Sequence, residues 1–343
     1  MKQQKESKSN LKSLAKMNLT KYFHDFKSKR ILIVGDAIID TYLWGEIHRM
    51  SPEAPVPVVD VAVNQNDSRL GGAANVALNL KELGAESILC TVIGNDNRGI
   101  LFEQLMQEQG LTLEGMLISN GRKTTTKTRV IADNKHQLRI DEEDTYPIKI
   151  EKQFYNLIEK LAHNIDAIIL QDYNKGVLTE NMIEKIICLA NKKNIPTIVD
   201  PKKQNFLSYK NCTLFKPNLN EIRDGLQTKI DSENTEEINQ KTSELRSLIS
   251  AKAILLTLSN KGIYLNTKNK NILKKSTTSN VIDVSGAGDT VVSVAAICLA
   301  CNINFEELAI LANIAGGIVC EKVGVVPINN TELLERAKKI LNE

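Results

Sequence analysis

The chain has 343 residues, 42% of them hydrophobic, which is enough to bury one large core or two smaller ones. Its 44 basic and 41 acidic residues nearly balance, so charge gives no reason to expect nucleic acid as a partner. The Lys-rich extension at residues 1–29 lacks the apolar core of a signal peptide, and no apolar run is long enough to span a membrane. The six cysteines are scattered, as in proteins of reducing compartments. We therefore expect a cytoplasmic protein without a membrane partner. We expect residues 1–29 to form a solvated and partly helical tail.

Short runs rich in Val, Ile and Leu alternate with longer stretches of helical periodicity. Runs that are apolar on both faces are typical of buried parallel strands, and the stretches between them are typical of helices that cover a sheet. In chain order they predict a strand at 31–34, a helix at 73–83, a strand at 87–93, a helix at 98–109, a strand at 167–170, a helix at 179–193, strands at 197–199 and 213–215, a helix at 243–250 and a strand at 253–257. This alternation predicts a doubly wound, mostly parallel α/β sheet flanked by helices, in one domain at residues 30–343. Ligands of such sheets collect at the carboxyl ends of the strands.

Two segments interrupt this alternation and have the character of extended strands. The first lies within residues 41–70 and contains three prolines followed by a Val-rich run. The second lies within residues 123–141 and alternates with period two around the turn-like Asp133-Asn134. We expect both to form a small β-sheet that protrudes from the body, either as a lid over a site or as a dimerisation surface.

A glycine-rich sequence opens an apolar helical run near the C-terminus. Gly286, Ala287 and Gly288 are small enough for backbone amides to approach an anion, and the helix dipole adds positive charge there. Asp289 would lie at this helix mouth, where it could accept a proton from an attacking hydroxyl. The same residues could instead form only a turn and an N-cap, which is common at helix starts.

A second cluster of small residues, Gly71-Gly72-Ala73-Ala74-Asn75, opens another predicted helix. The small residues allow a ligand to approach the backbone closely, and Asn75 could form hydrogen bonds with sugar hydroxyls. Asp36 and Asp40 follow the first strand, at the edge where substrate hydroxyls would bind. A packed helix–strand junction and ordinary turn residues are the structural alternatives.

Two strand-to-turn junctions carry groups suited to polyphosphate. In the first, Asn218-Leu219-Asn220-Glu221, the carboxylate could hold Mg²⁺ through water, although the spacing also matches a helix capping box. In the second, at residues 257–262, the candidates are Thr257, Ser259, Lys261 and Gly262, and a simple hairpin turn is the alternative. The sequence contains no G-x-x-x-x-G-K-[ST] loop, which excludes a P-loop kinase.

Taken in order, these clusters resemble the ribokinase-like sugar kinases, from about residue 30 to the C-terminus. Residues 71–75 resemble the sugar-binding signature of that family. Residues 283–289 resemble its second signature, in which the residues at 286–288 form an anion hole and Asp289 is the catalytic base. Residues 218–221 match its Asn-x-x-Glu motif for Mg²⁺ and phosphate, and Asn313 falls where the family contacts the nucleotide.

A further set of motifs is similar to the bacterial D-glycero-β-D-manno-heptose 7-phosphate kinases. It comprises Gly35-Asp36 with Asp40, the string Ser-Pro-Glu-Ala-Pro-Val-Pro at 51–57, Lys127-Thr128-Arg129-Val130 with Arg139, and Asp172-Tyr173-Asn174-Lys175-Gly176. Thr41, Leu70 and Asn174 depart from that pattern, which affects fine sugar contacts but not the catalytic assignment. Many such kinases carry a fused nucleotidyltransferase domain, and from this chain we expect only the kinase reaction.

The resemblance implies transfer of phosphate from ATP to the anomeric C1 hydroxyl of heptose 7-phosphate, a step toward ADP-heptose for the lipopolysaccharide core. It implies Mg²⁺ held through water by Glu221, leaves room for a monovalent cation, and favours a homodimer formed through the lid. Candidates for binding the substrate, including its existing phosphate, are Asp172, Lys127, Arg129, Arg139 and Lys175. Each cation could equally be a solvated charge on a strand edge.

Two other functions remain open at this stage. One is the same chemistry on another sugar or sugar phosphate, such as a fructose or ribose kinase, which a substrate panel distinguishes. The other is a non-catalytic, dimeric sugar-phosphate-binding protein on a kinase scaffold. This second function would require a disabled base, and the intact Asp289 argues against it.

Overall fold

The computed structural model describes residues 18–341, apart from residues 63, 65 and 134. Its body is built on a nine-stranded sheet with the strand order β14-β13-β12-β11-β10-β9-β1-β5-β6. Seven of these strands run parallel, namely β1 (Arg30–Gly35), β5 (Glu86–Gly94), β6 (Met116–Ser119), β9 (Ala167–Gln171), β10 (Thr197–Asp200), β11 (Leu214–Phe215) and β12 (Ala253–Thr257). The last two, β13 (Ile263–Thr267) and β14 (Asn271–Lys274), are antiparallel. All six strands predicted from apolar runs are therefore confirmed as neighbours in one sheet.

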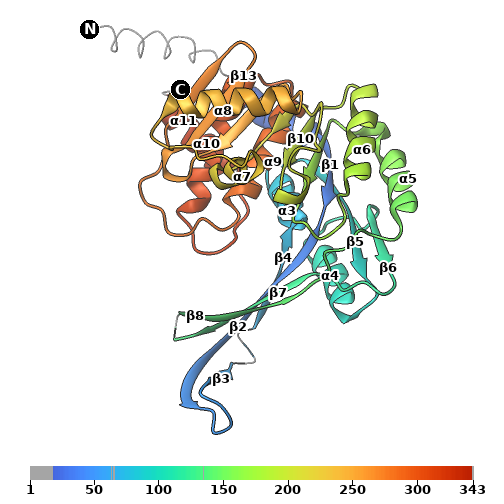
Figure 1. Ribbon diagram of the computed structural model, residues 1–343, viewed down its shortest axis with the longest axis vertical. Helices are drawn as coiled ribbons and strands as arrows, with labels where there is room; N and C mark the ends of the chain where they lie inside the picture. Colours follow the sequence, from blue (N-terminus) through green and yellow to red (C-terminus); the bar gives the residue numbers. More distant parts are fainter. Residues whose placement is uncertain (1–17, 63, 65, 134, 342–343) are drawn as a thin grey trace.

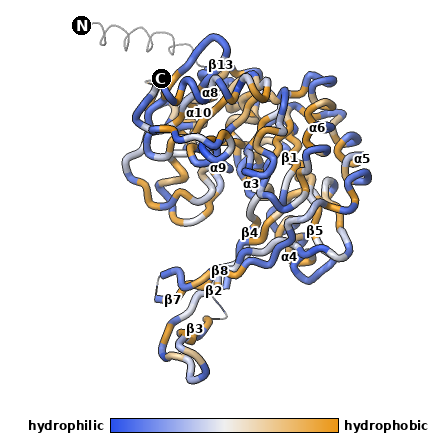
Figure 2. Tube along the Cα trace, in the orientation of Figure 1, coloured by the Kyte–Doolittle hydropathy of each residue, from blue (hydrophilic) through white to orange (hydrophobic). Residues whose placement is uncertain are grey.

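Helices cover both faces of this sheet, and each face has its own apolar core (Figure 1). One core is formed with α2 (Leu19–Asp25), α3 (Ala73–Glu82), α4 (Asn97–Glu108), α9 (Ala287–Ala300), α10 (Phe305–Cys320) and α11 (Asn330–Leu341). The other is formed with α5 (Glu151–Leu161), α6 (Glu180–Lys192), α7 (Leu219–Gly225) and α8 (Thr235–Leu248). In Figure 2 the outer helices α5 and α6 alternate between hydrophobic and hydrophilic residues, as expected for helices with one buried face.

The predicted helix at 243–250 is longer than its sequence pattern indicates. In the structure α8 begins at Thr235, because the side chain of Asn234 accepts a hydrogen bond of 3.1 Å from the backbone N–H of Glu237. The first turns of this helix are mostly polar and offer little apolar periodicity, which hides the N-terminal half from pattern analysis.

A second sheet of five strands projects from the body (Figure 1). It contains β2 (Ala37–Met50), β3 (Pro57–Val61), β4 (Asp67–Gly72), β7 (Thr126–Ala132) and β8 (Lys135–Glu142), and it confirms that the segments within 41–70 and 123–141 form a small protruding sheet. At the predicted turn, Asp133 has a φ of 52°, while Asn134 lies outside the described residues. We call this sheet the lid.

The segment just before residue 30 belongs to the folded body, which corrects the expectation of a solvated tail for residues 18–29. Leu19, Phe23 and Phe26 are buried in the same core as α3 and α9. The Lys residues hide this apolar spacing in the sequence. Residues 1–17 lie outside the described part of the chain. Within the described part, no helix is both long and apolar enough to cross a membrane.

Candidate active site

Asp289 lies in the first turn of α9, as the glycine-rich sequence predicts. Gly286 caps this helix with a φ of 77°, a conformation that glycine adopts without strain. A Cβ at Gly286 would lie 3.0 Å from Val325 and 3.3 Å from the Nδ2 of Asn75, so a larger residue would crowd both neighbours. Small residues at 286–288 leave the backbone of the helix mouth open to a ligand.

Three neutral side chains donate hydrogen bonds to the carboxylate of Asp289. The Nδ2 of Asn75 lies 2.7 Å from Oδ2, the hydroxyl of Tyr173 lies 2.7 Å from Oδ1, and the Nε2 of Gln171 lies 3.2 Å from Oδ1. The carboxylate is buried, and burial raises the pKa of Asp289 to about 6, with the nearby carboxylate of Asp200 acting in the same direction. A carboxylate with a pKa near neutrality is suited to accept a proton in the physiological range.

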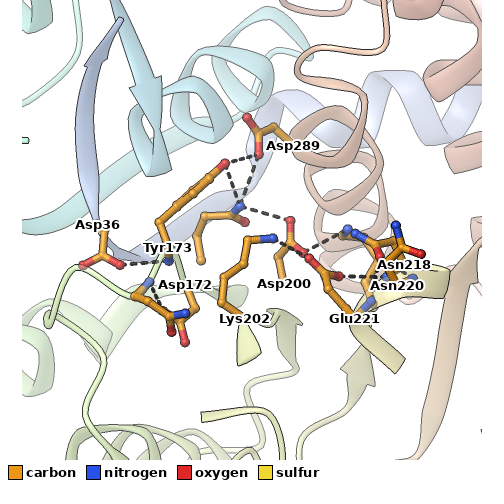
Figure 3. A network of polar contacts seen from close by, with 12 residues as sticks. Asp36, Asp172, Tyr173, Asp200, Lys202, Asn218, Asn220, Glu221 and Asp289 are labelled. Carbon is orange, nitrogen blue, oxygen red and sulfur yellow. Dashed lines mark hydrogen bonds and ion pairs between the residues drawn. The ribbon is translucent and has the colours of Figure 1, made fainter. Parts of the chain in front are cut away.

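A chain of charged groups leads away from Asp289 along the carboxyl ends of the strands (Figure 3). Asp200, at the end of β10, accepts a hydrogen bond of 3.1 Å from Gln171 and forms an ion pair of 3.0 Å with Lys216. Lys202 then pairs with Glu221 at the start of α7. These charged groups extend from Asp289 toward the predicted phosphate-handling motif.

The other end of the site meets the base of the lid. Asp40 of β2 lies against Gly71, where a Cβ would collide with its carboxylate. The Oδ1 of Asp40 accepts a hydrogen bond of 2.5 Å from Arg129 of β7, and the guanidinium of Arg129 stacks 5.2 Å from the ring centroid of Tyr42. Gly72 caps α3 with a φ of 57°, and this helix carries Asn75 to Asp289. The structure thus brings Asp40, Gly71, Gly72, Asn75 and Asp289 together.

Asp36 and Asp172 hold the loop after β9, in contrast to the expectation that they contact the sugar. Asp36 is buried and accepts hydrogen bonds from the backbone N–H groups of Tyr173, Lys175 and Val177, at 2.8, 3.1 and 3.1 Å. Burial raises the pKa of Asp36 to about 6.

The carboxylate of Asp172 is equally enclosed. It accepts hydrogen bonds from the backbone N–H of Asn174, from the side chain of Asn205 at 3.2 Å and from the hydroxyl of Tyr209 at 2.7 Å. Both aspartates are 1% exposed, so neither offers a surface to a substrate. Their position after a strand could not distinguish a ligand contact from a loop support.

The residues at 218–221 form a helix capping box, which the sequence offered as the structural alternative to a site for Mg²⁺ and phosphate. Asn218 accepts from the backbone N–H groups of Asn220 and Glu221, and Glu221 accepts from the backbone N–H of Asn218 at 2.8 Å. Leu219 packs against the second core. Because Glu221 also pairs with Lys202, it combines the capping role with a place in the charged chain. A bridge between Asn218 and Thr257 places that threonine beside the motif.

The remaining nucleotide-binding candidates lie in turns and on α10. Ser259 and Lys261 form a short 3-10 turn that ends at Gly262, whose φ is 95°. Lys261 is directed at Ser232 and Glu233 rather than at the Asp289 network. Asn313 is buried on α10 and donates a 2.7 Å hydrogen bond to the carbonyl of Lys275.

The cations proposed to hold a substrate phosphate are paired with lid carboxylates. Lys127 lies 3.0 Å from Asp141 and 3.2 Å from Glu143, which also lies 2.7 Å from Lys175. Arg139 is exposed and forms a bidentate pair with Asp141 at 2.8 and 3.0 Å.

Sequence reasoning missed several members of the site, namely Gln171, Asp200, Lys202 and Lys216, and it named Tyr173 only as part of the motif at 172–176. Asp200 and Lys216 come at the ends of two predicted strands, and the same rule that selected Asp36 could have found them. The importance of Gln171 and Tyr173 appears only from their contacts with Asp289.

Comparison with known proteins agrees with this geometry. The chain is 38% identical over 312 residues to the bifunctional protein HldE of Desulfatibacillum aliphaticivorans, a match that covers 90% of this chain and 63% of that protein. It is 37% identical over 317 residues to the bifunctional protein HldE of Helicobacter pylori strain J99, which covers 92% and 67%. The chain thus spans about two thirds or less of the length of these curated relatives.

Solved structures share the fold. Phosphofructokinase-2 from Escherichia coli in complex with fructose-6-phosphate superimposes with a TM-score of 0.73 at 16% identity, covering 92% of this chain and 99% of that one. Ribokinase from Arabidopsis thaliana complexed with ribose and ATP gives a TM-score of 0.70 at 19% identity, covering 90% and 98%. These similarities confirm the ribokinase-like fold.

The sequence pattern of pfkB family carbohydrate kinases matches residues 28–332, nearly the whole of the described body and lid. The expectation of a sugar kinase, a phosphotransferase with an alcohol group as acceptor, is therefore confirmed. The chain belongs to the pfkB family of carbohydrate kinases.

Proposed function

We propose that this protein phosphorylates the anomeric C1 hydroxyl of D-glycero-β-D-manno-heptose 7-phosphate with ATP, giving the 1,7-bisphosphate. The observation that carries the proposal is the placement of Arg129 beside Asp40, whose carboxylate lies against Gly71 of the predicted sugar-binding sequence. A kinase for a phosphorylated sugar needs a fixed cation near its hydroxyl-binding carboxylate, and Arg129 supplies one. Similarity to the HldE proteins and to the heptose 7-phosphate kinase motifs supports the same substrate.

In the reaction, Asp289 accepts the proton of the C1 hydroxyl while that oxygen attacks the γ-phosphorus of ATP, and the bond from this phosphorus to the β,γ-bridging oxygen breaks so that ADP leaves. The hydroxyl would replace Tyr173 or Asn75 as a partner of the carboxylate, since both now lie 2.7 Å from it. The backbone N–H groups of Gly286, Gly288 and Asp289 would face the transferring phosphoryl group and stabilise its charge, whereas that of Ala287 already donates to the carbonyl of Val284 at 3.2 Å. Such transfers depend mainly on positioning and electrostatics, which these rigid elements provide.

The residues near Glu221 fit Mg²⁺ that is held through water. Both oxygens of Glu221 already accept from protein donors, Lys202 and the backbone of Asn218, so a direct metal bond would displace one of them. Among the described residues, no group of three or more acidic, His or Cys side chains could hold an ion directly. Mg²⁺ retains several waters when it binds beside phosphates, which agrees with this arrangement. When bound, the ion would neutralise charge on the phosphates of ATP.

The lid would close the sugar end of the site and exclude water. Asp40, Tyr42, Lys127 and Arg129 occupy in-register positions on β2 and β7, so their side chains share one lid face. That face meets the body, because the side chain of Arg69, in register with Asp40 on β4, lies within 3.6 Å of the Cβ position of Gly324. Excluding water would favour transfer to the sugar over hydrolysis of ATP.

The opposite lid face supports a homodimer. Leu138 and Ile140 of β8 lie on this face, in register with Val130 and Thr128, and they are 51% and 46% exposed. Exposed aliphatic residues on a projecting sheet are a common sign of a contact surface. We expect Ile140→Lys to shift a wild-type dimer toward monomer in sedimentation velocity.

A substrate panel tests the function directly. Purified protein with Mg²⁺ and ATP should release ADP fastest with heptose 7-phosphate, and more slowly with fructose 6-phosphate, ribose and unphosphorylated heptose. A preference for another sugar would remove the heptose assignment and keep the sugar kinase. No ADP release with any sugar would favour the non-catalytic binding protein.

A further inference from the structure

Gln171 is a buried amide between two carboxylates that come from different elements. It ends β9, where it is in register with Asp200 of β10 on one side and Gly35 of β1 on the other. Its Nε2 lies 3.1 Å from the Oδ2 of Asp200 and 3.2 Å from the Oδ1 of Asp289, and 3.3 Å from the hydroxyl of Tyr173. The residue is fully buried, so these contacts are shielded from water.

The orientation of the Gln171 amide leaves a buried oxygen without a hydrogen bond in the described part of the chain, and packing alone does not explain this loss of stability. The Oε1 of Gln171 is buried and has no hydrogen-bond partner among the described residues. Turning the amide over would direct that oxygen at the two carboxylates, which repel it. The two N–H groups therefore point at the carboxylates while the oxygen stays unpaired. A buried acceptor without a donor destabilises a fold. The unpaired oxygen therefore indicates that the NH₂ group of Gln171 has a role in the site.

The two carboxylates differ in their counter-charges. Asp200 has a cation in contact, Lys216 at 3.0 Å, whereas the direct partners of Asp289 are the neutral side chains of Asn75, Tyr173 and Gln171. The charged groups that face Asp289 from neighbouring elements are Asp200 of β10, Lys216 after β11 and Lys202 after β10. Two like charges in a buried site disfavour double ionisation unless donors offset them.

We propose that Gln171 is a positioning residue that keeps Asp289 ionised beside Asp200 by donating hydrogen bonds to both carboxylates. This proposal rests on the role of Asp289 as the base. Without the amide, the repulsion from Asp200 would be unscreened and Asp289 would lose one of its three donors. The proton would then leave Asp289 only at higher pH, and less of the enzyme would be active near neutrality.

The test uses two variants and the pH dependence of kcat/KM, measured with the sugar that the wild-type enzyme phosphorylates best. Gln171→Met keeps the length of the side chain and removes both donors and the unpaired oxygen. Gln171→Glu keeps the shape, replaces the amide donor with a carboxyl group and adds a third negative charge wherever that group is ionised. In both, the acidic limb of the profile should move to higher pH, by about one unit for Met, the size expected for a lost hydrogen bond to a charged group.

Asn205→Leu is the matched control. Asn205 is also a buried amide that donates to a carboxylate, that of Asp172 at 3.2 Å, and its hydrogen bonds do not involve Asp289. Removing the Asn205 amide should lower the melting temperature without moving the acidic limb of the kcat/KM profile. If circular dichroism shows that Gln171→Met does not fold, the shift of the acidic limb in Gln171→Glu alone tests the proposal.

The outcomes separate this proposal from the proposed mechanism. A shift in the Gln171 variants and none in Asn205→Leu supports the positioning role. An acidic limb that coincides with that of the wild type, while Asp289→Asn is inactive, overturns it and leaves Asp289 as the base. An Asp289→Asn variant with wild-type turnover instead overturns the base assignment and with it this proposal.

Discussion

Arg129 of β7 donates a hydrogen bond of 2.5 Å to Asp40 of the neighbouring lid strand β2, so the lid carries this ion pair at the position where the sugar is expected. Arg129 is about one fifth exposed and also stacks on Tyr42, which fixes the plane of its guanidinium. The same cation could therefore serve two anions, the carboxylate of Asp40 and a substrate phosphate.

Arg129→Ala should raise the KM for the sugar phosphate by about one to two orders of magnitude, because charge-assisted hydrogen bonds contribute about 1.5–3 kcal/mol each. The KM for ATP should stay nearly constant. Steady-state kinetics with each substrate varied in turn gives both values. Arg30→Ala is the control, since Arg30 pairs with Glu86 at the start of β1 and β5, the end of the strands away from the site. An unchanged sugar-phosphate KM in Arg129→Ala would contradict its role in holding the phosphate.

Asp289→Asn should lower kcat by about 10²–10⁴, the usual effect of removing a general base. Binding of ATP, followed by calorimetry, should be preserved because Asn has the shape of Asp. Near-normal turnover in this variant would exclude Asp289 as the base.

The kcat/KM of the wild-type enzyme should fall on the acidic side of its pH profile, with a midpoint near pH 6. Burial raises the pKa of Asp289 to about 6, and a base works only when ionised, so kcat/KM should fall below that pH. Because this pKa is above that of an unfolded aspartate, ionisation of Asp289 weakens the fold as pH rises from about 4 to about 6. The difference in melting temperature between Asp289→Asn and the wild type should therefore be more positive at pH 8 than at pH 4. A constant difference would show that Asp289 has an ordinary pKa.

Glu221→Gln separates the two roles of the capping-box residue. If Glu221 orients metal-bound water, the variant needs more Mg²⁺ for half-maximal rate. If it only caps α7, the Mg²⁺ dependence stays the same and the stability in urea unfolding changes little, because Gln completes a capping box as Glu does. We expect the first result, since Glu221 and its partner Lys202 belong to the charged chain that leads to Asp289.

Phe23→Ala tests whether the segment before β1 belongs to the body. Phe23 is 4% exposed and packs against Phe26 with a centroid distance of 5.0 Å. Its loss should destabilise the protein by about 3–5 kcal/mol, as for other buried aromatic residues. His24→Ala, one position along and exposed, should leave the melting temperature unchanged. Equal stability of both variants would mean that this segment does not contribute to the core.

The sequence by itself determined the parts of this protein that depend on local pattern. Apolar runs located the six strands, because a strand buried on both faces must be apolar throughout. Glycines located the mouth of α9, because glycine adopts the positive φ of Gly286 without strain and leaves room for Asn75 beside it. The order of these motifs identified the family.

Only the tertiary structure decided which polar side chains meet. Asp36 and Asp40 look alike in sequence, yet one is enclosed by three backbone N–H groups and the other pairs with Arg129. Gln171 carries no motif of its own, and its position between Asp200 and Asp289 arises from strand register and from a helix more than a hundred residues away. A side chain's partners depend on distances across the whole fold, and local sequence does not encode them.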